Sequence, residues 1–129
     1  MAVAFCFIAT AALLSGCSKD YEHSQLGLDC AEAGQVREMV AALMAAGDQN
    51  LARTIADQSA SDLTESQSRM LTAVLTQIAS AQSVELTKID RFGEDILRAS
   101  LHLRGETGQR DIHMLLIARD GHLRWAGPN

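Results

Sequence analysis

The chain is poor in proline, in aromatic residues and in blocks of like charge. Its 129 residues include one proline, Pro128, and aromatic side chains make up 4% of the chain. Aliphatic side chains must therefore fill any core. The formal net charge is −5, and no block of Lys or Arg occurs that would attract a phosphate backbone. Composition thus gives no support to a nucleic-acid partner.

The sequence also lacks the short motifs that mark common active sites. It contains no Gly-rich phosphate loop, no serine elbow, no Cys-x-x-Cys pair and no metalloprotease helix. We therefore expect no catalytic residues and predict that the chain is not an enzyme.

Ala2–Leu14 forms an uncharged apolar run that is too short to span a bilayer as a helix. The run has 13 residues, whereas a spanning helix needs about 20. Its length is typical of the apolar part of a signal peptide. The alternative is a buried N-terminal helix, because no charged residue interrupts the run to give it a solvent face.

The run ends in Leu13-Leu14-Ser15-Gly16-Cys17, which resembles the lipobox of bacterial lipoproteins. The resemblance implies a signal peptide over residues 1–16, cleavage before Cys17, and diacylglycerol on the Cys17 sulfur. This covalent lipid would anchor the chain to a membrane, and no other cofactor is expected. Ser18 implies, by the same resemblance, the periplasmic face of the outer membrane, because Asp at that position is typical of inner-membrane lipoproteins.

The mature chain is expected to consist of a flexible tether and one domain. Residues 17–29 would be the lipidated cysteine and a flexible tether, and residues 30–127 a single domain. Ser18–Leu28 is polar, with neither helical nor alternating periodicity. Fully extended, these residues reach roughly 36 Å at about 3.3 Å each. The domain would therefore lie close to the bilayer.

Helical periodicity appears in two clear regions, with a weaker one between them. Asp29 and Glu32 predict a capped helix start, and Thr64 and Gln67 predict a second one. The apolar residues after each start have the spacing of one helix face. They are Val36, Met39, Val40, Leu43 and Met44 in the first region and Met70, Leu71, Val74, Leu75 and Ile78 in the second, with Leu51 and Ile55 between.

From Ser83 the period changes to two, which predicts four strands. Strict alternation in the first of them puts Leu86 and Ile89 on opposite faces. Helices followed by antiparallel strands indicate an α+β fold, with two to three N-terminal helices packed on a four-stranded antiparallel sheet. The strands are expected over about 83–89, 96–104, 109–119 and 122–126.

Two turns predict the register of the last three strands. The loop 105–108 places Arg104 opposite Gln109, and Asp120-Gly121 is a strong hairpin signal. Both registers bring apolar partners onto one face, and a slip of one residue would reverse every side chain. The predicted pairs are Leu101 with Ile112, Ala99 with Met114, Leu97 with Leu116, Ala118 with Leu123 and Leu116 with Trp125.

Residues 64–126, which end in Asp120-Gly121-His122-Leu123-Arg124-Trp125, resemble the cystatin-like and NTF2-like folds. Small bacterial lipoproteins whose last strands end in a glycine turn and a tryptophan are among the proteins with this order. The resemblance implies a fold and does not fix a function.

The sheet face opposite the apolar one collects basic side chains. We predict a possible binding face of Arg98, His102, Arg104, His113 and Arg124. Arginines bind carboxylates or phosphates in a bidentate manner, and a solvated strand face is the plainer alternative. No metal is expected, because the histidines lack the spacing of zinc motifs and the arginines would repel a cation.

Cys30 has no partner within the mature chain, because Cys6 leaves with the signal peptide and Cys17 carries the lipid. A reactive thiol, an intermolecular disulfide and a small buried side chain all stay open for Cys30.

These observations favour a membrane-anchored, non-catalytic envelope lipoprotein that binds a protein partner or a cell-wall component. One alternative is a small-ligand-binding or enzymatic NTF2-like domain, which would need a pocket with convergent polar groups. Another is an inhibitor or immunity lipoprotein that guards against a cell-wall enzyme.

Overall fold

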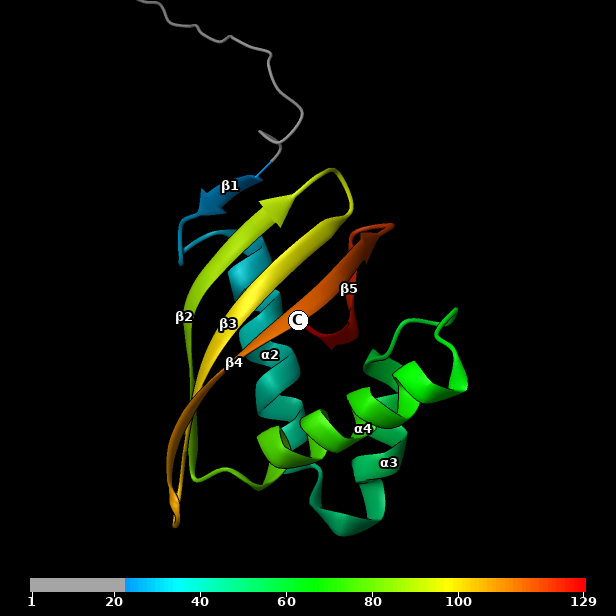
Figure 1. Cartoon of the computed structure of the whole chain (residues 1–129), viewed down its shortest axis with the longest axis vertical. Coiled ribbons are helices and arrows are strands. Elements are labelled where there is room, and N and C mark those ends of the chain that lie inside the picture. Colours follow the sequence, from blue (N-terminus) through cyan, green and yellow to red (C-terminus); the bar gives the residue numbers. More distant parts are fainter. Residues whose placement is uncertain (1–22) are drawn as a thin grey trace, which may run out of the picture.

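Five antiparallel strands form a curved sheet in the order β1-β2-β3-β4-β5, and three helices pack against one of its faces (Figure 1). This computed structural model describes residues 23–129. The helices are α2 (Ala31–Ala45), α3 (Gly47–Gln58) and α4 (Glu65–Ser80). The strands are β1 (His23–Leu26), β2 (Ser83–Phe92), β3 (Ile96–Gly105), β4 (Gly108–Arg119) and β5 (His122–Pro128). The predicted α+β class is confirmed.

The sheet has five strands rather than the predicted four. The additional strand, β1, lies in the segment expected to be tether, and its residues pair with β2 from Leu26 opposite Ile89 to His23 opposite Phe92. β1 is a short edge strand with a polar sequence. It therefore lacks the apolar alternation that predicts the other strands.

The register predicted from the two turns is confirmed. Arg104 lies opposite Gln109, and Arg119 lies opposite His122. The predicted apolar pairs follow, and the side chains of Leu97, Leu101, Met114, Leu116 and Trp125 are at most 1% exposed.

The alternation predicted for β2 was wrong at one point. Leu86 pairs with Leu101 and Lys88 pairs with Ser100, so Thr87 forms a β-bulge. The extra residue shifts the side-chain alternation by one position. Leu86 and Ile89 consequently both face the core, where both are buried.

Helix α2 begins one residue later than its sequence predicts. Cys30, not Asp29, is the N-cap, and its Sγ accepts a hydrogen bond from the Ala33 backbone N–H at 3.3 Å. The turn after β1, in which Cys30 N–H donates to Gly27 O, holds Cys30 in the extended conformation of a cap. Glu32 bonds to Arg91 of β2 instead, at 2.9 Å.

Helix α4 begins with the predicted capping box of Thr64 and Gln67. Of its predicted core residues, Leu71, Leu75 and Ile78 are buried, whereas Met70 is 56% exposed. The prediction for Met70 was wrong because the helix rests on the row formed by the three buried residues. That row faces the sheet and turns Met70 toward solvent.

Candidate functional site: the open face of the sheet

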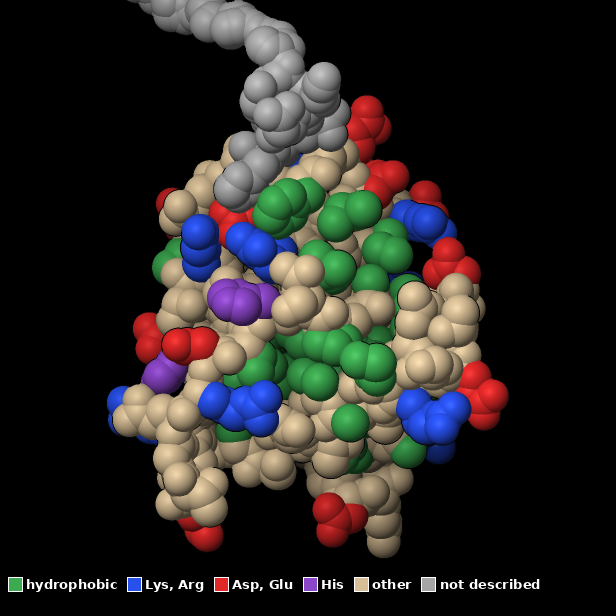
Figure 2. Space-filling view, in the orientation of Figure 1, with side chains coloured by type: hydrophobic (Ala, Val, Ile, Leu, Met, Phe, Trp, Pro, Cys, Tyr) green, Lys and Arg blue, Asp and Glu red, His purple; other side chains and the backbone are tan. Residues whose placement is uncertain are grey.

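The open face is the sheet face that the helices leave uncovered, and Figure 2 views the molecule from this side. Apolar side chains gather near its middle, with basic and histidine side chains beside them. Residues at alternate positions of β2 to β5 form it, among them Lys88, Asp90, Phe92, Arg98, Ser100, His102, Arg104, Asp111, His113, Leu115, Ile117 and Arg124. The predicted binding-face residues all lie on it.

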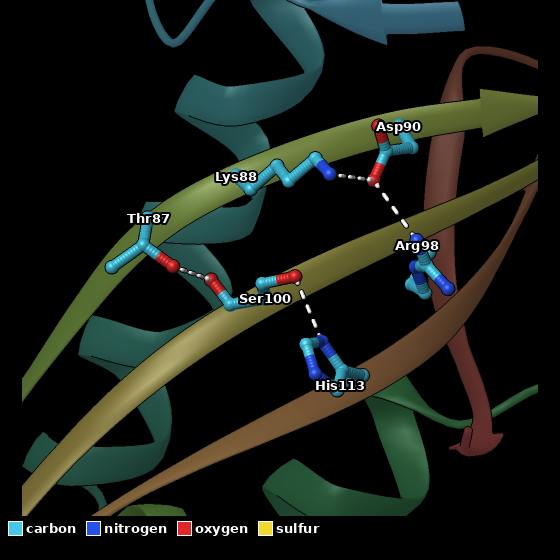
Figure 3. Close-up of polar contacts among 6 residues, drawn as sticks. All are labelled: Thr87, Lys88, Asp90, Arg98, Ser100 and His113. Atoms are coloured by element: carbon cyan, nitrogen blue, oxygen red, sulfur yellow. Dashed lines mark hydrogen bonds and ion pairs between the residues drawn. The ribbon is translucent and has the colours of Figure 1, made fainter.

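Asp90 is the buried centre of a charged group on this face (Figure 3). Its Oδ2 lies 3.4 Å from Arg98 Nη2 and 3.9 Å from Lys88 Nζ. The Arg98 guanidinium also stacks against Phe92, with Cζ 4.9 Å from the ring centroid. These contacts hold the arginine at a fixed position between β2 and β3.

A second group links the Thr87 side chain of β2, through Ser100 of β3, to His113 of β4. Ser100 Oγ lies 2.8 Å from His113 Nδ1, and Thr87 Oγ1 donates to Ser100 O at 3.1 Å (Figure 3). A serine beside a histidine is the start of a nucleophile–base pair, which also needs a third group to orient the base. Within residues 23–129, no carboxylate hydrogen-bonds the other ring nitrogen of His113.

His102 lies further along β3 in a group of its own. Its Nδ1 is 2.7 Å from Asp111 Oδ1, and its Nε2 is 2.9 Å from Gln109 Oε1. The hydrogen bond to Asp111, and then that to Gln109, raise the pKa of His102 above its usual 6.5. Both ring nitrogens are therefore occupied by neighbours on the same face.

The structure does not bring the three arginines of the open face together. Arg98 and Arg104 are six residues apart on β3, a separation of about 20 Å at about 3.4 Å per residue. Arg124 turns to the end of α3, where its Nη1 donates to Asp57 O at 2.6 Å. The three side chains therefore cannot grip one small carboxylate or phosphate, and only an extended partner could contact all of them.

The sequence pattern did not predict three residues of this face: Lys88, Asp90 and Phe92. The predicted alternation ended at Ile89, and the bulge at Thr87 reverses which residues of β2 face outward. The signal for Asp90 is its position two residues after Lys88, because residues two apart on a strand lie on the same face. This signal becomes useful only when β2 is paired with β3.

The helix side of the sheet is filled by apolar side chains. A hollow of about 240 Å³ lies between α2 and the first half of β2, and Arg37 is its one charged lining residue. A more polar hollow of about 420 Å³ lies between the end of α4 and the β3–β4 hairpin. It is lined by Arg104 and Arg110, and Arg110 Nη1 already donates to Gln77 Oε1 at 2.7 Å.

Two further observations concern metals and membranes. In the described part of the chain, no three His, Cys, Asp or Glu side chains are grouped so that they could hold a metal ion. None of the helices between residues 23 and 129 has the length and apolar character to cross a membrane. Cys17 and Ser18, which carry the predicted lipid and its sorting signal, lie outside the described residues.

The arrangement of helices and strands resembles the NTF2 fold. The chain is similar to a solved structure titled "De novo designed NTF2 fold protein NT-9", with a TM-score of 0.52 and 15% sequence identity. The match covers 81% of this chain and 85% of the designed one. No protein-family model and no curated protein match the sequence. NTF2-like folds occur in both enzymes and non-enzymes, so the likeness establishes architecture alone.

Proposed function

We propose that this protein is a lipid-anchored, non-catalytic lipoprotein of the bacterial cell envelope, and that its open face binds a partner protein rich in carboxylates. The observation that carries the binding role is the mixture of side chains on this uncovered face. Leu115 and Ile117 are half-buried beside Arg98 and His113. Apolar groups with arginine and aromatic neighbours are typical of protein–protein contact surfaces.

The chemistry of the partner follows from the arginines. A guanidinium carries five N–H donors, and Nη2 of Arg98 donates to Asp90 Oδ2. Part of Arg98 faces solvent, and Arg104 is exposed at the hairpin end. Because these charges are spread along β3, the proposed partner is a macromolecule with several Asp or Glu side chains.

Two features support surface binding over the small-ligand or enzymatic alternative. The hollow between α2 and β2 has an apolar lining apart from Arg37, so convergent polar groups are not found there. The polar groups around Asp90 and Ser100 lie on the open face, and in the more polar hollow beside the β3–β4 hairpin Arg110 is already bonded to Gln77.

Photocross-linking in bacterial cells tests the binding role. A photoreactive residue at His113 or Ile117 should give one discrete adduct, and Arg104→Glu should weaken it, because the substitution at this exposed position places a negative charge against the carboxylates of the partner. The matched control is the same photoreactive residue at Gln49, which is exposed on α3. Equal adducts from His113 or Ile117 and from Gln49, or adducts unaffected by Arg104→Glu, would refute the open face as the binding site.

Membrane fractionation tests the anchor separately. Lipid is attached to a cysteine sulfur, and several acyl chains give stable anchoring because each buried methylene contributes about 0.8 kcal/mol. Cys17→Ser should therefore move the protein from the membrane fraction to the soluble fraction. Cys30→Ser serves as the matched control and should leave the protein on the membrane. Retention of the Cys17→Ser protein would overturn the lipoprotein assignment.

A further inference from the structure

Within the described residues 23–129, the outer edge of β2 is only partly covered. β1 pairs with Ile89–Phe92 and lies beside one end of β2 in Figure 1. Among residues 23–129, no strand pairs with the outer edge of Ser83–Lys88. This stretch is about 20 Å long at about 3.4 Å per residue, and its backbone N–H and C=O groups form a template for another strand.

An apolar groove runs directly below this free edge. It is the hollow of about 240 Å³ between α2 and β2, and its strand side is formed by Val84 and Leu86 of β2 with Leu101 of β3. Side chains of an added strand would lie next to those of β2, because neighbouring strands are about 4.8 Å apart. Every second side chain of such a strand would thus enter the groove. Its helix side is formed by Val36, Arg37, Val40, Ala41 and Met44.

We propose that the free edge of β2 is a strand-addition site for an extended segment of a partner protein, with apolar side chains toward α2 and a basic side chain opposite Glu85. Backbone hydrogen bonds would supply affinity and the groove would select alternate apolar residues. This site goes beyond the open-face function, because it uses the sheet edge and the helix side.

Charge distinguishes this partner from a second copy of the chain. Glu85 is exposed on the open-face side of the edge. If two copies paired through β2 with Val84 opposite Leu86, Glu85 would lie opposite Glu85 of the other copy. Like charges directly opposite one another destabilise a strand pair, whereas a Lys or Arg at this position stabilises it.

The chain that follows β1 does not fill the edge either. Leu26 is the last residue of β1 to pair with β2. The chain then turns away, with Cys30 N–H donating to Gly27 O at 3.1 Å, and enters α2. The segment that would have continued along β2 is used to reach the helix.

A peptide titration tests the proposal. The probe is acetylated and amidated Glu-Thr-Val-Lys-Val-Thr, whose antiparallel pairing places its lysine opposite Glu85 and its valines beside Val84 and Leu86. Added to the isotope-labelled full chain in detergent micelles, it should shift the NMR signals of Ser83–Lys88 and of the groove-lining residues of α2. It should also slow amide exchange along that edge. The same peptide with methylated backbone nitrogens should not bind.

Two variants on α2 separate the groove from general effects. Ala41→Arg fills the groove and should weaken peptide binding by about tenfold or more, since one anchored apolar side chain is lost. Ala42, the next residue of α2, is also exposed but does not line the groove. Ala42→Arg should change the affinity by no more than about twofold, as is usual for surface substitutions.

Several results would overturn the proposal. They are the absence of shifts along Ser83–Lys88, equal binding of the methylated peptide, and equal weakening by the two arginine variants. Protection of these amides in a dimer of the free chain would assign the edge to a second copy instead. None of these results depends on Arg98 or His113, so failure here and failure of the open-face function can be told apart.

Discussion

The guanidinium of Arg98 lies 3.4 Å from the carboxylate of Asp90, a side chain with no exposed surface. A buried carboxylate is destabilising unless cations and hydrogen-bond donors surround it. Lys88 and Arg98 supply positive charge from β2 and β3, and Phe92 packs on the guanidinium. Arg98 Nε is buried with no hydrogen-bond partner among the described residues. The charged group at the centre of the open face is therefore a structural contact between β2 and β3, and its side chains are not simply solvated charges.

Removal of Arg98 should destabilise the fold. We expect Arg98→Met to lower the free energy of unfolding by about 1–3 kcal/mol, because it removes a cation from a buried carboxylate. Urea unfolding followed by the fluorescence of Trp125, the single tryptophan, measures the change. The matched control, Arg104→Met at an exposed position of the same strand, should stay within about 0.5 kcal/mol of the wild type. Equal effects of the two substitutions would contradict a structural role for Arg98.

Gln58 should contribute to stability through a buried bridge. Its Oε1 accepts a hydrogen bond from Trp125 Nε1 at 2.8 Å, and its Nε2 donates to Met39 O at 3.1 Å. Gln58→Ala leaves a buried indole N–H without its acceptor, so the free energy of unfolding should fall by about 1–3 kcal/mol. Thermal or urea unfolding measures this loss, and Gln49→Ala on the exposed part of α3 is the control. A loss no larger than that of the control would show that the bridge does not contribute.

The His102–Asp111 pair should make stability depend on pH. The hydrogen bond to Asp111 raises the pKa of His102 in the folded state above its usual 6.5. The resulting stabilisation is fully present below that value and is lost as the pH rises through the higher pKa of the folded protein. Asp111→Asn should lower the pKa of His102 in an NMR titration and should remove this pH-dependent part of the stability. An unchanged pKa in the variant would show that the hydrogen bond does not control the titration.

Cys30 should act as a helix cap, so the stability of its variants should depend on whether the new side chain can cap the helix. Its Sγ accepts a hydrogen bond from the Ala33 N–H at the start of α2. Serine can accept the same bond and alanine cannot, so Cys30→Ser should be more stable than Cys30→Ala by about 1 kcal/mol in urea unfolding. The comparison between the two variants cancels the loss of the sulfur atom that both share. Equal stabilities would mean that the thiol packs against its neighbours without capping the helix.

The sequence alone determined the helices, strands and turns that are specified by residues close together in the chain. The periods of 3.6 and two residues placed α2, α4, β3 and β4, because each element repeats its own apolar face within a short segment. The turns at 105–108 and at Asp120-Gly121 set two registers correctly, since hairpin geometry depends on a few neighbouring residues. The same local alternation places five side chains on one face of the sheet: Arg98, His102, Arg104, His113 and Arg124.

Only the tertiary structure decided the features that depend on segments far apart in the chain. β1 forms because His23–Leu26 meets β2 more than sixty residues later. The bulge at Thr87 allows Leu86 and Ile89 to share the core, and it turns Asp90 toward Arg98. The groove below the edge of β2 exists because α2 crosses beneath it. No local period encodes these contacts, since they arise from how the helices and strands pack together.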